Sequence, residues 1–154
     1  MKILMVCLGN ICRSPLADGL LRQKVKDNSL SIVVDSAGTS ALHEGEKPDS
    51  RMMEVSKNFG TDLSFLRSRP ITKSDLDEFD LIYTMDRDNY WDVLNMCSTK
   101  EQEEKIIPIL DLIYPNENQS VPDPYFGGEQ GFVNVYKMLD LATDKIILNF
   151  KKNG

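Results

Sequence analysis

Residues 2–27 read KILMVCLGNICRSPLADGLLRQKVKD, and this stretch contains the transition that decides the fold. Lys2–Val6 is an apolar run of the length of a buried strand. Pro15–Asp27 carries leucines at the spacing of one helical face. Only a short segment, Cys7–Ser14, separates the two. The sequence therefore predicts a buried strand that turns almost directly into a helix.

The same alternation continues along the chain. Further strands are predicted at Ser31–Ser36, Phe79–Met85 and Ile106–Leu110. Two further helices are predicted at Ser50–Phe59 and Asp86–Met96. A long C-terminal helix is predicted from the helical spacing of Phe132, Val135, Leu139, Ala142 and Ile146. Gly60 follows the second helix where a C-terminal cap is favoured. This pattern predicts an α/β fold, a parallel sheet with helices on both faces. With 154 residues and no linker, we expect a single domain over residues 1–154.

In such sheets, ligands bind where strand ends meet helix starts, and the first such junction is Cys7–Ser14. Successive backbone N–H groups on a tight loop form an anion-binding nest, and the following helix adds its positive end. Gly9 and Asn10 tolerate the positive φ that such a loop needs. Ser14 suits the helix N-cap, and Pro15 suits the first helical position. The loop therefore predicts a phosphate site.

Two side chains of this loop could act on a bound phosphate. Arg13 offers a planar fork for two phosphate oxygens. Cys7 would lie beneath the anion, kept by its surroundings as a reactive thiolate in line for attack. Taken alone, Cys-x5-Arg is equally compatible with a buried strand-end cysteine and a solvated arginine. Its place on a strand-to-helix turn favours the catalytic interpretation.

The segment CLGNICRSP at residues 7–15 resembles the signature of the low-molecular-weight protein tyrosine phosphatases. The resemblance continues through DSAGTS (35–40), KPDSR (47–51), RPITK (69–73), Met85-Asp86 and VPDPYF (121–126), in family order. It implies a flavodoxin-like three-layer αβα sandwich with a four-stranded parallel sheet. It also implies a cysteine nucleophile, a phosphotyrosine protein as substrate, and no metal or other cofactor.

The resemblance assigns further site residues. Asp123, held between two prolines, is implied to be the general acid and then the general base. The residues implied to bind the phosphate are Leu8, Gly9, Asn10, Ile11, Cys12 and Ser14. Ser36 is implied to support the loop together with Asn10 and Ser14. The walls of the substrate crevice are implied to be formed by Leu42, Tyr125 and Phe126. Leu42 and, by our alignment, Leu66 stand where mammalian members have Trp and His.

The three cysteines have different expected roles. Cys12 is only five positions from Cys7, and the family uses such a pair to protect the nucleophile as a reversible disulfide. Cys97 is expected to be structural. His43 is the only histidine, which excludes a Cys–His–Asp triad and a His-based metal site, and we expect it to be a solvated loop residue.

Composition narrows the functional classes. A net charge of −6 argues against nucleic acid or an anionic membrane as partner. No run approaches the ~20 apolar residues that span a bilayer, and the apolar start is too short for a signal peptide. An odd number of cysteines favours reduced thiols in the cytoplasm.

Two rival functions stay open on this scaffold. An arsenate reductase relays a disulfide through two further, closely spaced cysteines, whereas Cys97 stands alone. A non-catalytic phosphotyrosine-binding module would need neither Cys7 as nucleophile nor Asp123 as acid.

Overall fold

The computed structural model of the protein describes residues 1–153, apart from the side chain of Phe126. Its sheet is parallel and four-stranded, with the order β2-β1-β3-β4, which confirms the flavodoxin-like four-stranded sheet that the resemblance implied. The strands are β1 (Lys2–Cys7), β2 (Val33–Gly38), β3 (Leu81–Thr84) and β4 (Ile106–Pro108). The last is shorter than predicted because the chain turns at Ile109 into a 3-10 helix, η1 (Ile109–Leu112).

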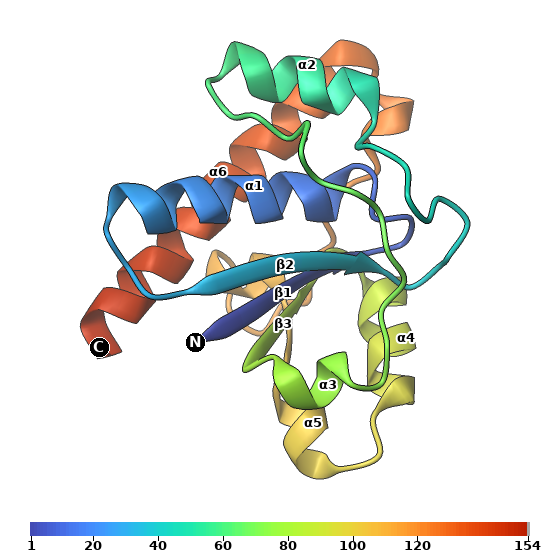
Figure 1. The fold of residues 1–154 in the computed structure, drawn as a ribbon, viewed down its shortest axis with the longest axis vertical. Coiled ribbons are helices and arrows are strands. Elements are labelled where there is room, and N and C mark those ends of the chain that lie inside the picture. The colour runs from blue at the N-terminus through green and yellow to red at the C-terminus, as the bar shows by residue number, and fades with distance from the viewer. Residues whose placement is uncertain (154) are drawn as a thin grey trace.

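Helices cover both faces of the sheet (Figure 1). One face carries α1 (Arg13–Asp27), α2 (Ser50–Asn58) and α6 (Gly128–Asn153), and the other carries α3 (Asp75–Glu78), α4 (Arg87–Met96) and α5 (Lys100–Glu104). The predicted helices are confirmed to within a few residues, and Gly60 has the left-handed φ of +90° expected after α2. The short helices α3 and α5 were not predicted. No helix in residues 1–153 is long and apolar enough to cross a membrane.

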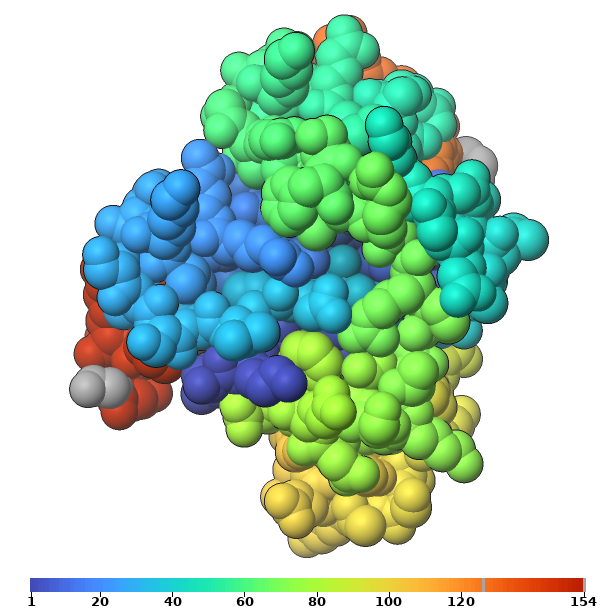
Figure 2. All heavy atoms as spheres, viewed as in Figure 1, coloured from blue at the N-terminus to red at the C-terminus, as the bar shows by residue number. Residues whose placement is uncertain are grey.

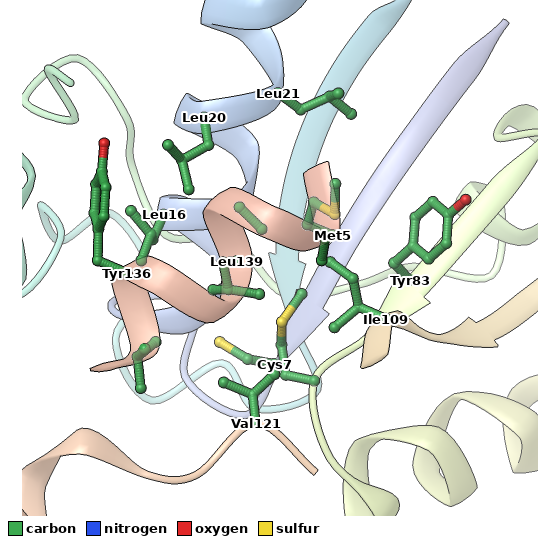
Figure 3. Packing of buried hydrophobic residues seen from close by; sticks show 14 of the residues in the cluster. Met5, Cys7, Leu16, Leu20, Leu21, Tyr83, Ile109, Val121, Tyr136 and Leu139 are labelled. Carbon is green, nitrogen blue, oxygen red and sulfur yellow. The ribbon is translucent and has the colours of Figure 1, made fainter. Parts of the chain in front are cut away.

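Each face has its own apolar core. Leu16, Leu20 and Leu21 of α1 pack with Leu139 of α6 over Met5 of β1 (Figure 3). On the other face, α3 and α4 cover the alternate residues of β1 and β3. The spaced apolar residues predicted for the C-terminal helix are all buried. Because β1 is covered on both faces, its C-terminal end is held firmly, and Cys7 lies at that end of the core.

A long connection between α2 and α3 wraps the β2 edge of the sheet. It packs against α1, where Leu63 lies over Gly19, and then runs down past β2 (Figure 2). Gly38 N–H donates to the Arg69 carbonyl, and Ile71 N–H donates to the Gly38 carbonyl (both 2.8 Å). The segment thereby extends the sheet beside the end of β2, next to the Cys7–Ser14 loop.

Gly38 is predicted to be essential for this close packing. A Cβ there would lie 2.7 Å from the Leu8 carbonyl oxygen and 3.2 Å from Asn10 Cβ, so Gly38→Ala must displace backbone. We expect a loss of about 1–3 kcal/mol in the free energy of unfolding, measured by urea denaturation. Val33→Ala, at the exposed end of the same strand, is the control. A Gly38→Ala protein as stable as Val33→Ala would contradict this packing.

Candidate active site

The loop between β1 and α1 contains one residue with a left-handed backbone conformation. Asn10 has φ +54°, which confirms the sequence-based expectation, and its side chain is buried. Gly9, in contrast, does not have positive φ. The space beside it is occupied instead, because a Cβ on Gly9 would lie 3.0 Å from Cδ2 of His43. Glycine is therefore needed here for close packing, not for backbone conformation.

Most carbonyl groups of the loop are engaged by residues outside it. Those of Cys7 and Leu8 accept from Thr39 and Ser40 N–H (both 3.0 Å). Three more are engaged in the same way: Gly9 accepts from Ser68 Oγ (2.9 Å), Ile11 from Asp49 N–H (2.6 Å) and Cys12 from Leu16 N–H (3.2 Å). The N–H groups of residues 9–12 have no acceptor within the described residues. Free N–H groups around one centre form an anion-binding nest.

The start of α1 differs from the prediction. The helix begins at Arg13 with Cys12 as N-cap, and no side chain caps it, so Ser14 and Pro15 lie inside its first turn. Ser14 cannot serve as a cap because its hydroxyl is engaged in the loop. The uncapped N–H groups of this turn stay available to a ligand.

Ser14 connects Asn10 to Cys7. Asn10 Nδ2 donates to Ser14 Oγ (2.8 Å), and Ser14 Oγ lies 3.0 Å from Cys7 Sγ. Since the serine oxygen already accepts from Asn10, its single proton is free to be donated to the sulfur. Asn10 Oδ1 in turn accepts from the Arg69 N–H (3.0 Å), which fixes the orientation of the amide. The chain of bonds therefore places a hydroxyl donor directly beside the Cys7 sulfur.

Arg13 is almost fully buried, and neighbouring elements hold one end of it. Its Nη1 donates to Asp86 Oδ2 and to the Val121 carbonyl, both at 2.9 Å. Asp86 also caps α4 by accepting from the Asn89 N–H. Within residues 1–153, Nε and Nη2 of Arg13 have no acceptor, which leaves two edges of the guanidinium for phosphate oxygens.

Asp123 lies at the mouth of the pocket. It caps the 3-10 helix η2 (Pro124–Phe126), with Oδ1 accepting from the Tyr125 N–H at 3.0 Å. This bond fixes one carboxylate oxygen and leaves Oδ2 for the pocket. The cavity, of about 180 Å³, is lined by Cys7, Leu8, Gly9, Ile11, Cys12, Arg13, Ser40, Leu42, His43, Asp123, Pro124 and Tyr125.

Two of the three residues predicted to form the walls of the crevice line the cavity. Leu42 is 81% exposed and Tyr125 is 39% exposed, and their role as walls stays a prediction. Burial, together with the negative charge of Asp49, raises the pKa of Tyr125. The side chain of Phe126 lies outside what the structure describes.

The expectation that His43 is a solvated loop residue is wrong. Its side chain is only 33% exposed, packs on Gly9 and lines the pocket. The Nδ1 atom of His43 lies 2.6 Å from Glu46 Oε2, so Glu46 engages this ring nitrogen and not Nε2. A single histidine in a polar loop gives no sequence signal for such packing.

The residues that hold the Cys7–Ser14 loop are only partly those that were predicted. Ser36 is buried and lowers the pKa of the neighbouring Asp18 of α1, so its role as loop support remains a prediction that would act through α1. Burial raises the pKa of the Asp18 carboxyl, opposed by Arg22 and Ser36. Leu66 is buried in the core, and the Arg69 N–H provides the bond to Asn10.

The three cysteines occupy different surroundings. Cys7 and Cys12 are both buried at the pocket floor as free thiols. Burial and the neighbouring Cys7 raise the pKa of the Cys12 thiol. Cys97 packs in the core on the other face of the sheet, with Sγ 3.5 Å from the Val93 carbonyl oxygen. In the described part of the chain, no group of three His, Cys, Asp or Glu side chains could hold a metal ion.

Sequence reasoning missed the contacts that come from distant segments. Asp86 directly follows the predicted third strand, so its position at a strand end was a usable signal. The backbone N–H of Arg69 and the ion pair between Asp49 and Arg51 leave no such signal.

Comparisons with known proteins agree with this geometry. A family model described as low molecular weight phosphotyrosine protein phosphatase matches residues 2–154. The phosphatase of that name from Schizosaccharomyces pombe is 37% identical over 141 residues, covering 90% of this chain and 89% of that protein.

Solved structures superpose over almost the whole chain. The protein tyrosine phosphatase of Entamoeba histolytica with Hepes in its active site is 40% identical, with a TM-score of 0.92, covering 99% of this chain and 98% of that one. A Drosophila arginine phosphatase is 31% identical, with a TM-score of 0.89 and 98% of both chains covered. This chain belongs to the low-molecular-weight phosphotyrosine protein phosphatase family.

Proposed function

We propose that the protein hydrolyses phosphotyrosine in proteins, and other aryl phosphates, through a cysteinyl-phosphate intermediate at Cys7. The observation that carries this proposal is the loop itself. Most of its carbonyl groups accept from residues outside the loop, and its N–H groups at 9–12 have no acceptor in the described part of the chain. A buried sulfur lies in the same cavity as the Arg13 guanidinium, of which only Nη1 is engaged. Such a site binds a phosphoryl dianion with a nucleophile beneath it.

The first step transfers the phosphoryl group to the enzyme. The Cys7 sulfur attacks phosphorus, an S–P bond forms, and the P–O bond to the phenol breaks. The loop N–H groups and Arg13 Nε and Nη2 hold the equatorial oxygens, whose charge must be stabilised in the transition state. Ser14 Oγ lies 3.0 Å from the sulfur and holds it in place for the attack.

Asp123 handles the protons in both steps. Its free oxygen gives a proton to the departing phenolate, and the resulting carboxylate then takes a proton from water. That water attacks phosphorus, the S–P bond breaks, and inorganic phosphate leaves with Cys7 restored as thiolate.

The pocket walls favour an aryl group over a guanidinium. Ile11, Leu8, Leu42 and Tyr125 present apolar surface above the loop, which suits the ring of phosphotyrosine. A phosphoarginine side chain would bring several N–H groups against these walls, and burying polar groups without partners is costly. We therefore place this chain with the tyrosine phosphatases among its relatives.

The structure weakens both rival functions. Cys97, on the opposite face of the sheet from Cys7 and Cys12, is poorly placed for an arsenate reductase relay. A binding module would not need a carboxylate at the mouth and a thiol at the floor of one cavity. We also propose a cytoplasmic location, supported by three free thiols, one of which must stay reduced for catalysis.

Cys7 and Arg13 should be indispensable for turnover of an aryl phosphate such as p-nitrophenyl phosphate, and chelators should have no effect. Cys7→Ser should abolish turnover while inorganic phosphate still binds. Arg13→Lys keeps the charge but loses the fork, and we expect a loss of about 10²–10³-fold in kcat. Undiminished activity in Cys7→Ser would exclude Cys7 as the nucleophile.

Asp123→Ala should slow hydrolysis most for phenols that are poor leaving groups, because only these need a proton in the transition state. General acid catalysis typically supplies about 10²–10⁴-fold. Rates measured across a series of substituted phenyl phosphates test this, with Asp92→Ala on exposed α4 surface as control. An equal loss for good and poor leaving groups would exclude Asp123 as the acid.

Mild peroxide should inactivate the enzyme reversibly through a Cys7–Cys12 disulfide. Cys7 is attacked first to give a sulfenic acid, and Cys12 displaces its hydroxyl, releasing water. Because the pKa of Cys12 is raised, little of it is thiolate at neutral pH. Disulfide formation should therefore accelerate as the pH rises.

Peptide mapping and recovery by a dithiol reductant measure this outcome. Cys12→Ser should stay active but lose reversibility, and Cys97→Ser should behave as the parent. A dominant disulfide to Cys97 would count against the phosphatase assignment and reopen the reductase relay.

A further inference from the structure

The segment that carries Asp123 is tied down on both sides. Upstream, the buried Val121 donates its N–H to the Met85 carbonyl (2.7 Å) and accepts from Arg13 Nη1 (2.9 Å). Residues 122–124 then cross the pocket mouth with Asp123 exposed. Downstream, the Pro124 backbone packs against Gly131 of α6, and the Asp123 carboxylate accepts from the Tyr125 N–H. The orientation of the Asp123 side chain therefore depends on how firmly Tyr125 is held.

Tyr125 is held by an arginine from another element. Its ring packs edge-on against Phe132 of α6, with 5.9 Å between ring centroids. The guanidinium of Arg51, in the first turn of α2, lies 4.7 Å from the Tyr125 ring centroid and 4.9 Å from that of Phe132. Such cation–π contacts fix an aromatic ring in one orientation. Because the Tyr125 N–H also bonds to Asp123 Oδ1, the ring and the carboxylate move together.

Asp49 anchors the arginine and joins it to the phosphate loop. Arg51 Nη2 and Nε donate to the two Asp49 oxygens at 3.1 and 3.3 Å. Burial alone would raise the pKa of Asp49, but hydrogen bonds from Arg51 outweigh it and hold that pKa below its usual range. The negative charge of Asp49, after burial, also raises the pKa of the Tyr125 hydroxyl, so the carboxylate lies near that end of the ring. The Asp49 N–H, finally, donates to the Ile11 carbonyl at 2.6 Å.

We propose that Arg51 is a positioning residue for proton transfer: braced by Asp49 and stacked on Tyr125, it holds the Asp123 carboxylate at a fixed place over the phosphate loop. The proposal rests on the phosphatase function proposed above and adds a residue that does not touch substrate. In this proposal, the Asp49–Arg51 ion pair connects the segment that carries the acid, Asp123, to the loop that carries the nucleophile, Cys7.

A double-mutant cycle tests whether Arg51 acts through Asp123. Arg51→Met keeps most of the side-chain length and removes the charge. Since Arg51 is more than half exposed, each of its contacts is modest, and we expect a loss of about three- to tenfold in kcat. The loss should appear with a poor phenol leaving group and be nearly absent with a good one. In an Asp123→Ala background, Arg51→Met should cause no further loss with the poor leaving group.

Two comparisons separate positioning from a general effect on folding or charge. Lys57→Met, in the same helix at its exposed far end, removes the same charge and should match the parent. The inhibition constant for inorganic phosphate should be unchanged in Arg51→Met, because the loop stays intact. Equal losses for both substrates, or losses that add in the double mutant, would overturn the proposal.

Amide hydrogen exchange gives a readout that does not need turnover. In Arg51→Met, a peptide covering residues 121–127 should exchange faster than in the parent or in Lys57→Met. If the parent shows no hydrolysis, the phosphatase function fails, and this measurement still decides the role of Arg51. Unchanged exchange in this peptide would show that Arg51 does not hold the segment.

Discussion

The site depends on a chain of three hydrogen bonds that all point toward one sulfur atom. The Arg69 N–H donates to Asn10, Asn10 donates to Ser14, and Ser14 is left with one proton for Cys7. The bond from Arg69 fixes the orientation of the Asn10 amide, and the bond from Asn10 occupies the Ser14 oxygen, so that the serine proton can face the sulfur. The left-handed conformation of Asn10 (φ +54°) allows the loop to close around this chain. The same turn of backbone sends the loop carbonyls outward and leaves its N–H groups facing the anion site.

The rest of the fold brings distant segments to this loop. The end of β3 supplies Asp86, which orients Arg13, and the segment after η1 supplies the Val121 carbonyl. The connection between α2 and α3 supplies Ser68 and Arg69, which bind the loop from the β2 side. A parallel sheet suits this assembly because all its strands end at one edge. The acid at residue 123 and the nucleophile at residue 7 line one cavity, and Arg13 helps to join them by donating to the Val121 carbonyl.

The sequence predicts the fold well because its signals are local. The apolar run of β1, the leucine spacing of α1 and the cap at Gly60 each lie within a few residues. The left-handed Asn10 was predictable for the same reason. The packing of His43 on Gly9, the Arg69 bond to Asn10 and the Arg51 stack on Tyr125 join residues that are far apart in sequence. Only folding brings them together, and the helix start at Ser14 was misplaced because its hydroxyl serves that remote network.

The central claim is that Cys7 forms a covalent bond to phosphorus, and trapping that bond tests it most directly. Enzyme mixed with an aryl phosphate is quenched in acid within milliseconds, digested, and mapped by mass spectrometry. One phosphoryl group is expected on the peptide that contains Cys7, and it should be absent in Cys7→Ser and longer-lived in Asp123→Ala. Product release with no phosphorylated peptide under any of these conditions, or a phosphoryl group on another residue, would contradict this claim.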